Sequence, residues 1–215
     1  MTEQSRPARQ LEKHYIGKDT DIRYSIRRCI HAEECVRRLP TVFDPAKRPW
    51  IAPDAATAEE VLRVVTLCPS GALHVAAGEV IPAENTVRLW ENRPLQFTGN
   101  MHIAGATLEI DETRATLCRC GASKNKPFCD NTHRATQFVA AHDAPPTTSS
   151  TARGGSLTIT PEANGPLQVL GNVEVINVAG ETIFSGTETY LCRCGASNNK
   201  PFCDGSHERI GFQAE

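Results

Sequence analysis

The sequence has no apolar run approaching the roughly 20 residues that a membrane-spanning helix requires. It also lacks a large excess of either charge, since 23 basic and 25 acidic residues leave a formal net charge of −2. Neither nucleic acid nor a membrane is therefore indicated as a partner. The segment Met1–Lys18 is polar and contains no apolar core of the kind found in signal peptides. We therefore expect a soluble, cytoplasmic protein.

Cysteine, by contrast, is abundant, with nine residues in 215. The number is odd, and clustered cysteines without an export signal more often hold metal than form disulfides. Metal binding is therefore the favoured interpretation. The nine form three groups of three: Cys29, Cys35 and Cys68; Cys118, Cys120 and Cys129; and Cys192, Cys194 and Cys203.

One segment occurs twice, at residues 118–133 and 192–207, and both copies read C-R-C-G-A-S-x-N-K-P-F-C-D-x-x-H. Three thiols and one imidazole at the same spacing, twice, predict a soft-metal site, and both zinc and an iron–sulfur cluster fit this donor set. The candidate ligands are Cys118, Cys120, Cys129 and His133 in the first copy and Cys192, Cys194, Cys203 and His207 in the second.

The residues between the candidate ligands suit such a site. The two thiols of C-R-C can reach one metal atom with Arg119 turned away from it, and Gly121 allows the sharp bend that follows. The last cysteine and the histidine are four residues apart, so a helical turn places them on one face. Asp130 stands where a carboxylate can cap free N–H groups. We also expect the Ser123 hydroxyl and nearby backbone N–H groups to donate to sulfur.

The two copies resemble the CDGSH iron–sulfur proteins, the mitoNEET family, whose motif is C-x-C-x2-(S/T)-x3-P-x-C-D-G-x-H. The second copy matches throughout, and the first departs at Asn131, where the motif has glycine. Asparagine tolerates left-handed backbone, so we expect the first site to survive. The resemblance implies one [2Fe–2S] cluster per copy, with the first two cysteines on one iron and the third cysteine and the histidine on the other. In the family two such units pair about a two-fold axis, with strands interleaved in a β-cap.

A longer internal repeat surrounds these segments, because residues 94–103 match residues 166–175. We predict a first CDGSH unit at 80–140, a linker rich in Pro, Ser, Thr and Gly at 141–155, and a second unit at 156–215. Each unit should comprise a few strands, a metal loop and a helical turn, and the two should pack as an intramolecular pseudo-dimer with a β-cap. Strand-like alternation is present at residues 86–90, 107–110, 156–160 and 188–191.

The first part of the chain predicts a small α+β domain at residues 20–78, preceded by a loose polar lead-in up to Gly17. The expected elements are a strand at 22–26, a short helix ending before Pro40, a helix opened by the capping box 57–60, and a strand at 72–76. The C-x5-C turn, the V-F-D after it and the later C-P-S-G-A-L resemble the divergent small relatives of single-cluster bacterial ferredoxins. The fold class is therefore α+β, with a ferredoxin-like domain before two β-rich units.

The ferredoxin resemblance implies a cluster held by Cys29, Cys35 and Cys68, but Ala32 stands where the family has a further cysteine. A full [4Fe–4S] site needs four ligands. Three thiols fit a [3Fe–4S] cluster or a [4Fe–4S] cluster with a foreign fourth ligand. The alternative is a domain that has lost its cluster and keeps three free thiols. His31 lies one position from the usual slot, and we interpret it as a surface histidine.

Three functions remain open. The leading one is electron transfer through two histidine-ligated [2Fe–2S] clusters, with a redox protein as partner. The second is storage of clusters and their transfer to apo iron–sulfur acceptor proteins, and the third is a structural zinc module. No nucleophile or phosphate-binding motif is present, so we expect no enzyme. Basic residues near the first cysteines could dock an acidic partner, although a solvated face is favoured; they are Arg27, Arg28, Arg37, Arg38, Lys47 and Arg48.

Overall fold

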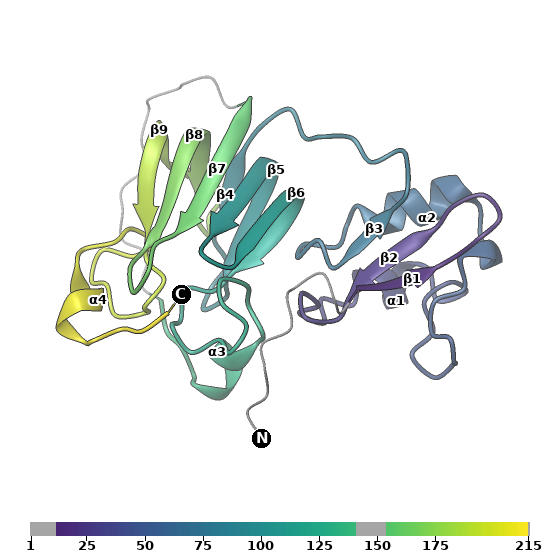
Figure 1. Ribbon diagram of the computed structural model, residues 1–215, viewed down its shortest axis with the longest axis horizontal. Coiled ribbons are helices and arrows are strands. Elements are labelled where there is room, and N and C mark those ends of the chain that lie inside the picture. The colour runs from purple at the N-terminus through teal and green to yellow at the C-terminus, as the bar shows by residue number, and fades with distance from the viewer. Residues whose placement is uncertain (1–11, 141–153, 215) are drawn as a thin grey trace. The chain divides into compact units, whose positions relative to one another are not determined.

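The structure is a computed structural model that describes residues 12–140 and 154–214. The chain divides into two compact units, one ending at Val80 and one beginning at Ile81, and each is described by itself (Figure 1). Most of the predicted linker, residues 141–153, lies outside the described residues. No helix in the described ranges has both the length and the apolar character needed to cross a bilayer.

The N-terminal unit is a three-stranded antiparallel sheet of order β1-β2-β3 with short helices. Its elements are β1 (Glu12–Tyr15), β2 (Ile22–Ser25), α1 (Glu34–Arg38), a 3-10 turn (Pro53–Ala55), α2 (Ala58–Val65) and β3 (Leu73–Val75). The predicted strands and helices of this unit are confirmed to within a few residues. Their apolar faces enclose a core of their own that includes Ile22, Phe43 and Val61.

Helix α2 begins at the predicted capping box. The Thr57 hydroxyl accepts a hydrogen bond from the Glu60 backbone N–H at 3.3 Å, and the Glu60 carboxylate accepts one from the Thr57 N–H at 2.9 Å. Two N–H groups that the first helical turn leaves without intrahelical partners are therefore satisfied. Val61, Val64 and Val65 lie on the buried face, as the helical spacing predicts.

Strand β1 corrects one expectation. The sequence analysis placed residues 12–15 in a loose lead-in because they read as polar, and that prediction is wrong. Their backbone pairs with β2, with Tyr15 opposite Ile22, and Tyr15 packs against the core. The strand is held by backbone hydrogen bonds to a neighbour in space, which a local pattern of side chains does not reveal.

The C-terminal unit is rich in strands and has two helices of one turn each within the described residues. Its elements are β4 (Thr86–Arg88), β5 (Leu95–Gly105), β6 (Leu108–Leu117), α3 (Thr132–Ala135), β7 (Ser156–Pro161), β8 (Leu167–Ile176), β9 (Thr182–Leu191) and α4 (Ser206–Arg209). Strand β5 pairs with β4, β6 and β7, and β8 pairs with β7, β9 and β4, so the strands close into a small barrel.

In each repeat the first strand, β4 or β7, lies between the two long strands β5 and β8, one of which belongs to its own repeat and one to the other. Strand β4 is antiparallel to β5 and parallel to β8, while β7 is antiparallel to β8 and parallel to β5. A glycine in the middle of each long strand permits the change of partner. Gly171 has φ +116, and a Cβ there would lie 2.4 Å from the Ser156 carbonyl oxygen of β7; Gly99 is crowded in the same way by Asn85.

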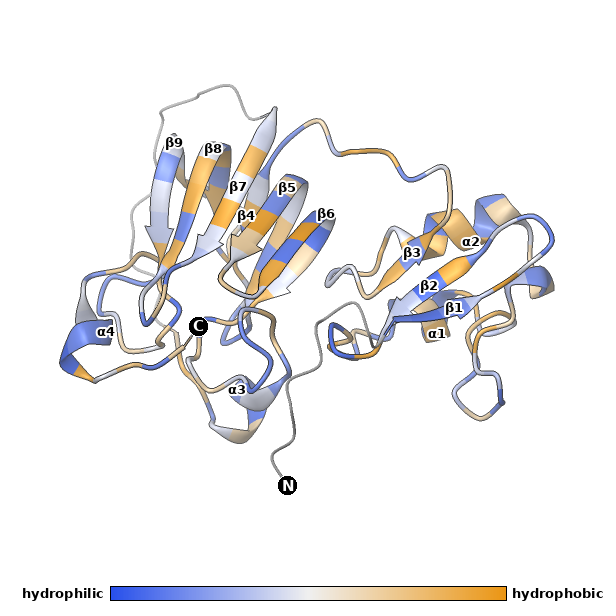
Figure 2. Cartoon of the chain, in the orientation of Figure 1, coloured by the Kyte–Doolittle hydropathy of each residue, from blue (hydrophilic) through white to orange (hydrophobic). Residues whose placement is uncertain are grey.

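The two long strands β5 and β8 correspond to the matching segments at residues 94–103 and 166–175, for which the sequence predicted a repeat but no secondary structure. Their side chains alternate between apolar and polar, as Figure 2 shows. Those that point inward form one core shared by both repeats, and they include Phe97, Met101, Val169 and Val173. Strand β6 is longer than the run predicted at 107–110 and delivers the chain directly to Cys118.

Candidate metal centres

The second copy of the repeated segment follows β9 and places its four candidate ligands in two pairs. Cys192 and Cys194 are buried, with their Sγ atoms 3.8 Å apart. Cys203 Sγ lies 3.3 Å from Nδ1 of His207, whose ring is carried by α4. The loop between the pairs folds back on the strand end, since the Cys192 N–H donates to the Pro201 carbonyl at 2.8 Å.

The first copy repeats this geometry after β6. Cys118 and Cys120 have Sγ atoms 3.7 Å apart, and Cys129 Sγ lies 3.4 Å from His133 Nδ1. In both copies the structure therefore brings together the two pairs of residues that we expected to bind one metal atom each. Each pair offers two donors to one metal atom.

The turn before each one-turn helix has left-handed backbone at one residue. Gly205 has φ 80 and Asn131, which replaces the motif's glycine, has φ 69. The prediction that asparagine adopts this conformation is confirmed. The Asn131 N–H points at Cys129 Sγ at 3.3 Å, and the Gly205 N–H points at Cys203 Sγ at 3.5 Å. The residue with left-handed backbone thus supplies an N–H donor to sulfur in both copies.

The aspartate after the third cysteine closes the loop. Asp130 accepts from the Thr132 N–H at 3.0 Å and from the Lys124 N–H at 2.8 Å, which confirms the predicted capping role. The expectation for Ser123 is only half right. Its hydroxyl donates to the Phe128 carbonyl at 2.7 Å, so its single proton is not available to sulfur. Donation to sulfur comes from backbone N–H groups instead.

Burial makes these thiols hard to ionise without a cation. Burial raises the pKa of Cys192 and of Cys129 to about 11. Within the first pair, the hydrogen bond between the thiols raises the pKa of Cys118 and lowers that of Cys120 to about 7. Two thiolates this close repel each other, and a bound metal ion removes the repulsion and deprotonates both. The donor set fits a soft cation.

The three N-terminal cysteines also come together. Cys29, Cys35 and Cys68 line one small cavity, and Tyr24 forms part of its wall. Burial, and then the charge of Cys68, raises the pKa of Cys35 to about 11. Ala32 lines the same cavity and offers no donor. The cavity therefore presents three thiols and, at Ala32, an apolar wall.

Within residues 12–140 and 154–214, no three His, Cys, Asp or Glu side chains converge closely enough to hold a single metal ion. The prediction that His31 lies at the surface is confirmed, because its side chain is exposed. The candidate donors thus form two pairs in each repeated copy and a triplet around the N-terminal cavity.

Comparison with known protein families covers both parts of the chain. A family described as iron-binding zinc finger, CDGSH type, matches residues 92–134 and 164–208. A family described as divergent 4Fe-4S mono-cluster matches residues 15–78. The chain belongs to the CDGSH iron–sulfur domain proteins. It is a tandem CDGSH protein with an N-terminal domain of the divergent single-cluster ferredoxin type, and it binds iron–sulfur clusters.

Part of the chain also has curated relatives. Uncharacterized protein YjdI of Escherichia coli strain K12 is 37% identical over 59 residues, which are 27% of this chain and 78% of the relative. The YjdI of E. coli O157:H7 matches with the same values. In both cases the match covers about a quarter of this chain and more than three quarters of the relative.

The two metal loops of the CDGSH protein lie back to back. A Cβ on Gly121 would lie 2.3 Å from the carbonyl oxygen of Cys194, and a Cβ on Gly195 would lie 2.6 Å from that of Cys120. Both glycines have positive φ, at +79 and +85. Each position therefore requires glycine for two reasons: the positive φ of the bend and the close approach of the other loop.

Sequence reasoning missed the role of the arginine inside each C-R-C turn. Arg119 is 2% exposed and Arg193 is 0% exposed. Arg119 donates to the carbonyls of Arg93 at 2.5 Å and Trp90 at 2.7 Å, and Arg193 bonds the matching carbonyls of Gly165 and Glu162. Each guanidinium thus ties its metal loop to the segment before the unit's long strand.

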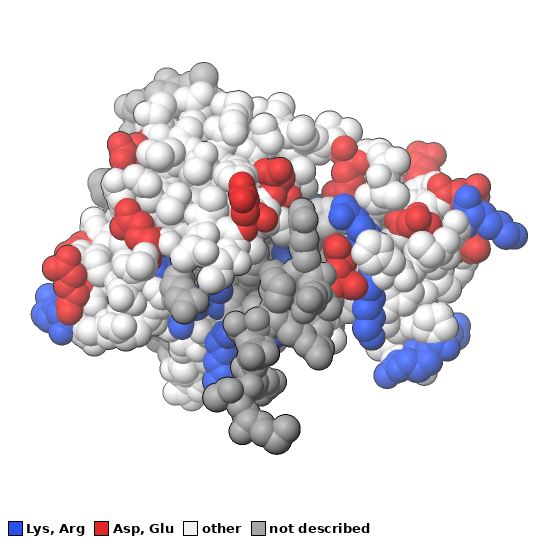
Figure 3. All heavy atoms as spheres, in the orientation of Figure 1, with Lys and Arg blue, Asp and Glu red and all other residues white. Residues whose placement is uncertain are grey.

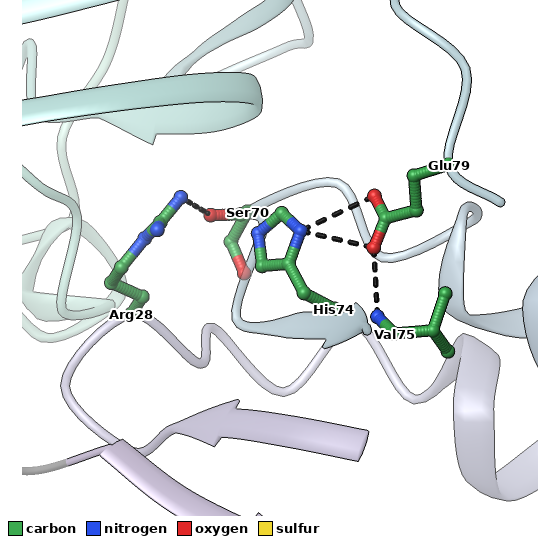
Figure 4. A network of polar contacts seen from close by, with 5 residues as sticks. All are labelled: Arg28, Ser70, His74, Val75 and Glu79. Atoms are coloured by element: carbon green, nitrogen blue, oxygen red, sulfur yellow. Dashed lines mark hydrogen bonds and ion pairs between the residues drawn. The ribbon is translucent and has the colours of Figure 1, made fainter. Parts of the chain in front are cut away.

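A third buried arginine stands beside the N-terminal cysteines. Arg28 is 6% exposed, and its guanidinium donates to the Ser70 carbonyl at 3.0 Å, two residues after Cys68 (Figure 4). Nearby, the Glu79 carboxylate accepts from the Val75 N–H at 2.9 Å and lies 3.1 Å from His74 Nδ1. In each of the three groups of cysteines, an arginine stands directly beside a cysteine in the sequence, and this is the sequence signal that could have identified the three buried arginines.

The remaining basic residues near the first cysteines are largely neutralised. Arg37 pairs with Glu33 at 2.7 Å and Arg38 with Glu34 at 2.6 Å, both one helical turn apart. Acidic and basic side chains lie next to one another on the face of this unit shown in Figure 3. A solvated face, rather than a docking patch, accounts for these charges.

Proposed function

We propose that each CDGSH unit holds one [2Fe–2S] cluster through three cysteines and one histidine, and that the protein transfers electrons. The observation that carries this proposal is the pairing of the donors, which recurs in both copies at distances that agree to 0.1 Å. A binuclear cluster with two protein ligands on each iron requires two such pairs. One iron of each cluster would be held by Cys118 with Cys120 or Cys192 with Cys194, and the other by Cys129 with His133 or Cys203 with His207.

The protein residues set the environment of such a centre. When bound, the cluster supplies a one-electron couple. In the first cysteine pairs of the two units, Cys118, Cys192 and Cys194 are buried and Cys120 is partly exposed. The N–H groups of Asn131 and Gly205 lie against the sulfur of the third cysteine. An imidazole in place of a fourth thiolate makes the centre less negative, which favours a higher reduction potential. The His207 side chain is 15% exposed, whereas His133 is buried at 7% exposure.

We further infer that the two units form an internal version of the family's two-fold pair, with a β-cap. The exchange of β4 and β7 between the repeats, the shared core and the back-to-back metal loops support this arrangement. The two centres would then be carried by one rigid scaffold, which favours electron exchange between them.

The N-terminal domain is proposed to hold a third cluster. Cys29, Cys35 and Cys68 surround one cavity, and the buried Arg28 provides a positive charge next to it. With Ala32 in the fourth position, the ligand set fits a [3Fe–4S] cluster or a [4Fe–4S] cluster whose fourth ligand is not a cysteine.

A second candidate function is the delivery of clusters to apo iron–sulfur proteins. It is favoured by the partial exposure of Cys203 and His207, the ligand pair through which a cluster would leave. A structural zinc site is a weaker alternative, because the donors lie as pairs rather than as a converging set.

Repeated reduction and reoxidation of anaerobically purified protein separates these functions. Electron transfer predicts that the visible absorbance returns after each cycle and that apo-ferredoxin, added in excess, gains little iron or sulfide. Cluster delivery predicts rapid loss of the absorbance to apo-ferredoxin. A colourless protein rejects both.

A further inference from the structure

A cavity of about 370 Å³ opens beside the ligand histidine of the first CDGSH unit. His133 itself forms part of the wall, together with Arg93, Arg134, Phe138 and Val139. A molecule seated in the cavity would therefore contact a candidate cluster ligand directly.

The two arginines give this edge a positive charge. Both are exposed, and within the part of the chain that the structure describes neither forms an ion pair. Glu91 also lines the cavity and offsets only one of the two positive charges. This contrasts with the N-terminal unit, where Arg37 and Arg38 are paired with glutamates.

The second unit has the opposite charge at the matching positions. The match is fixed by hydrogen bonds: Asn92 Oδ1 accepts from the Ala140 N–H at 2.8 Å, and Asn164 Oδ1 accepts from the Ala214 N–H at 2.9 Å. Next to these anchors, Gly165 replaces the arginine at position 93.

After the ligand histidine the difference grows. Glu208 stands where the first unit has Arg134, and its Oε1 lies 3.9 Å from His207 Nε2. Glu162 stands where the first unit has Trp90. Arg209 is the one basic residue added here, and it bonds the Ser206 hydroxyl at 2.9 Å. Two otherwise similar sites therefore present edges of opposite charge.

The first edge also offers an apolar contact. Val139 is 72% exposed, and it follows Phe138, which packs its ring against the buried Arg119 at 5.8 Å. The matching residue in the second unit is Gln213. An apolar contact flanked by unpaired arginines is the pattern of a protein docking site, in which charge steers the encounter and the apolar centre holds it.

We propose that the His133 edge of the first CDGSH unit docks an acidic redox protein and that the His207 edge does not. The inference rests on the proposed electron-transfer function and adds to it the partner's chemistry and the centre that faces the partner. With clusters bound, one electron would pass from the partner to the first centre, so the partner would be oxidised as the centre is reduced. The second centre would then receive electrons through the first.

The test exchanges the charges of the two edges with matched substitutions. Arg134→Glu gives the first unit the residue of the second, and Glu208→Arg does the reverse. Both positions are exposed, so folding should be unaffected. The probe is an acidic ferredoxin, whose affinity for the full-length protein is measured by calorimetry. Its reoxidation by the protein, after prior chemical reduction, is followed by stopped flow, and both measurements are made at about 0.01 M and about 1 M salt.

At low salt Arg134→Glu should weaken binding at least about fivefold and slow electron exchange, while Glu208→Arg should create a second binding site. Both effects should vanish at high salt. Unchanged affinity for the ferredoxin in both Arg134→Glu and Arg93→Gly would overturn the proposal. Full displacement of the ferredoxin by inorganic phosphate at constant ionic strength would also overturn it, because it would show that the edge binds small anions. A protein that lacks reversible visible absorbance would instead refute the proposed function itself.

Discussion

The buried arginine of the first metal loop provides a sharp quantitative prediction. Replacing Arg119 with glutamine removes the donors that hold the carbonyls of Arg93 and Trp90 at 2.5 and 2.7 Å. Hydrogen bonds from a charged group contribute about 1.5–3 kcal/mol each. Glutamine can retain one donor, and the loss of a buried charge recovers part of its desolvation cost. We therefore expect Arg119→Gln to lower the free energy of unfolding by about 3 kcal/mol.

The assay follows from the placement of the two tryptophans. Trp50 lies in the N-terminal unit and Trp90 in the CDGSH unit, so a Trp50→Phe background reports the CDGSH unit alone. With a urea dependence of about 1–3 kcal/mol per molar, the midpoint of unfolding should fall by about 1–3 M. The control is Arg88→Gln, an exposed arginine 5.9 Å from the Trp90 ring, which should cost no more than about 1 kcal/mol. If Arg119→Gln and Arg88→Gln unfold at the same midpoint, the buried hydrogen bonds do not hold the loop as described.

Three further predictions concern single positions. Gly121→Ala combines positive φ with a Cβ 2.3 Å from the Cys194 oxygen, so it should lower the free energy of unfolding by about 3–5 kcal/mol. The control is Gly180→Ala, at φ +88 in open space, which should lower it by about 1–2 kcal/mol. Equal costs of the two substitutions would rule out the close contact of the loops. Replacing His133 or His207 with cysteine should slow the loss of visible absorbance at mildly acidic pH, because an imidazole must lose a proton to bind iron; unchanged decay would show that the histidines are not the points of release. Hydrogen bonds from the Thr57 backbone and hydroxyl lower the pKa of Glu60, so its stabilising effect is present above the ordinary value of about 4.3 and is lost as the pH falls through the lowered value. The free energy of unfolding of the N-terminal unit, followed through Trp50, should therefore decrease below about pH 4, and Glu60→Gln should flatten that response; an identical pH profile in the variant would contradict it.

Much of the fold follows from local patterns. The capping box fixed the start of α2, and the spacing of Val61, Val64 and Val65 identified its buried face. The repeated segment predicted the two donor pairs in each unit and the left-handed turn at Asn131. These features depend on residues close together in sequence, so local physics determines them.

The features that escaped prediction depend on partners distant in the chain. Strand β1 is polar along its length and exists because β2 lies beside it. The long strands β5 and β8 carry clear alternation that signals a strand, yet their exchange of neighbours at Gly99 and Gly171 is visible only in three dimensions. Arg119 reads as a surface residue because charged side chains are seldom fully buried, and only its backbone carbonyl partners explain its position.

The content of the metal sites tests the central claim most directly. Iron, acid-labile sulfide and zinc should be measured on protein produced with ample iron and purified without air, together with electron paramagnetic resonance of the reduced form. Two [2Fe–2S] clusters predict about four irons and about four sulfides per chain, rising to about seven or eight irons if the N-terminal cysteines hold a cluster as well. Colourless protein carrying about two zinc ions per chain and no sulfide would contradict the account.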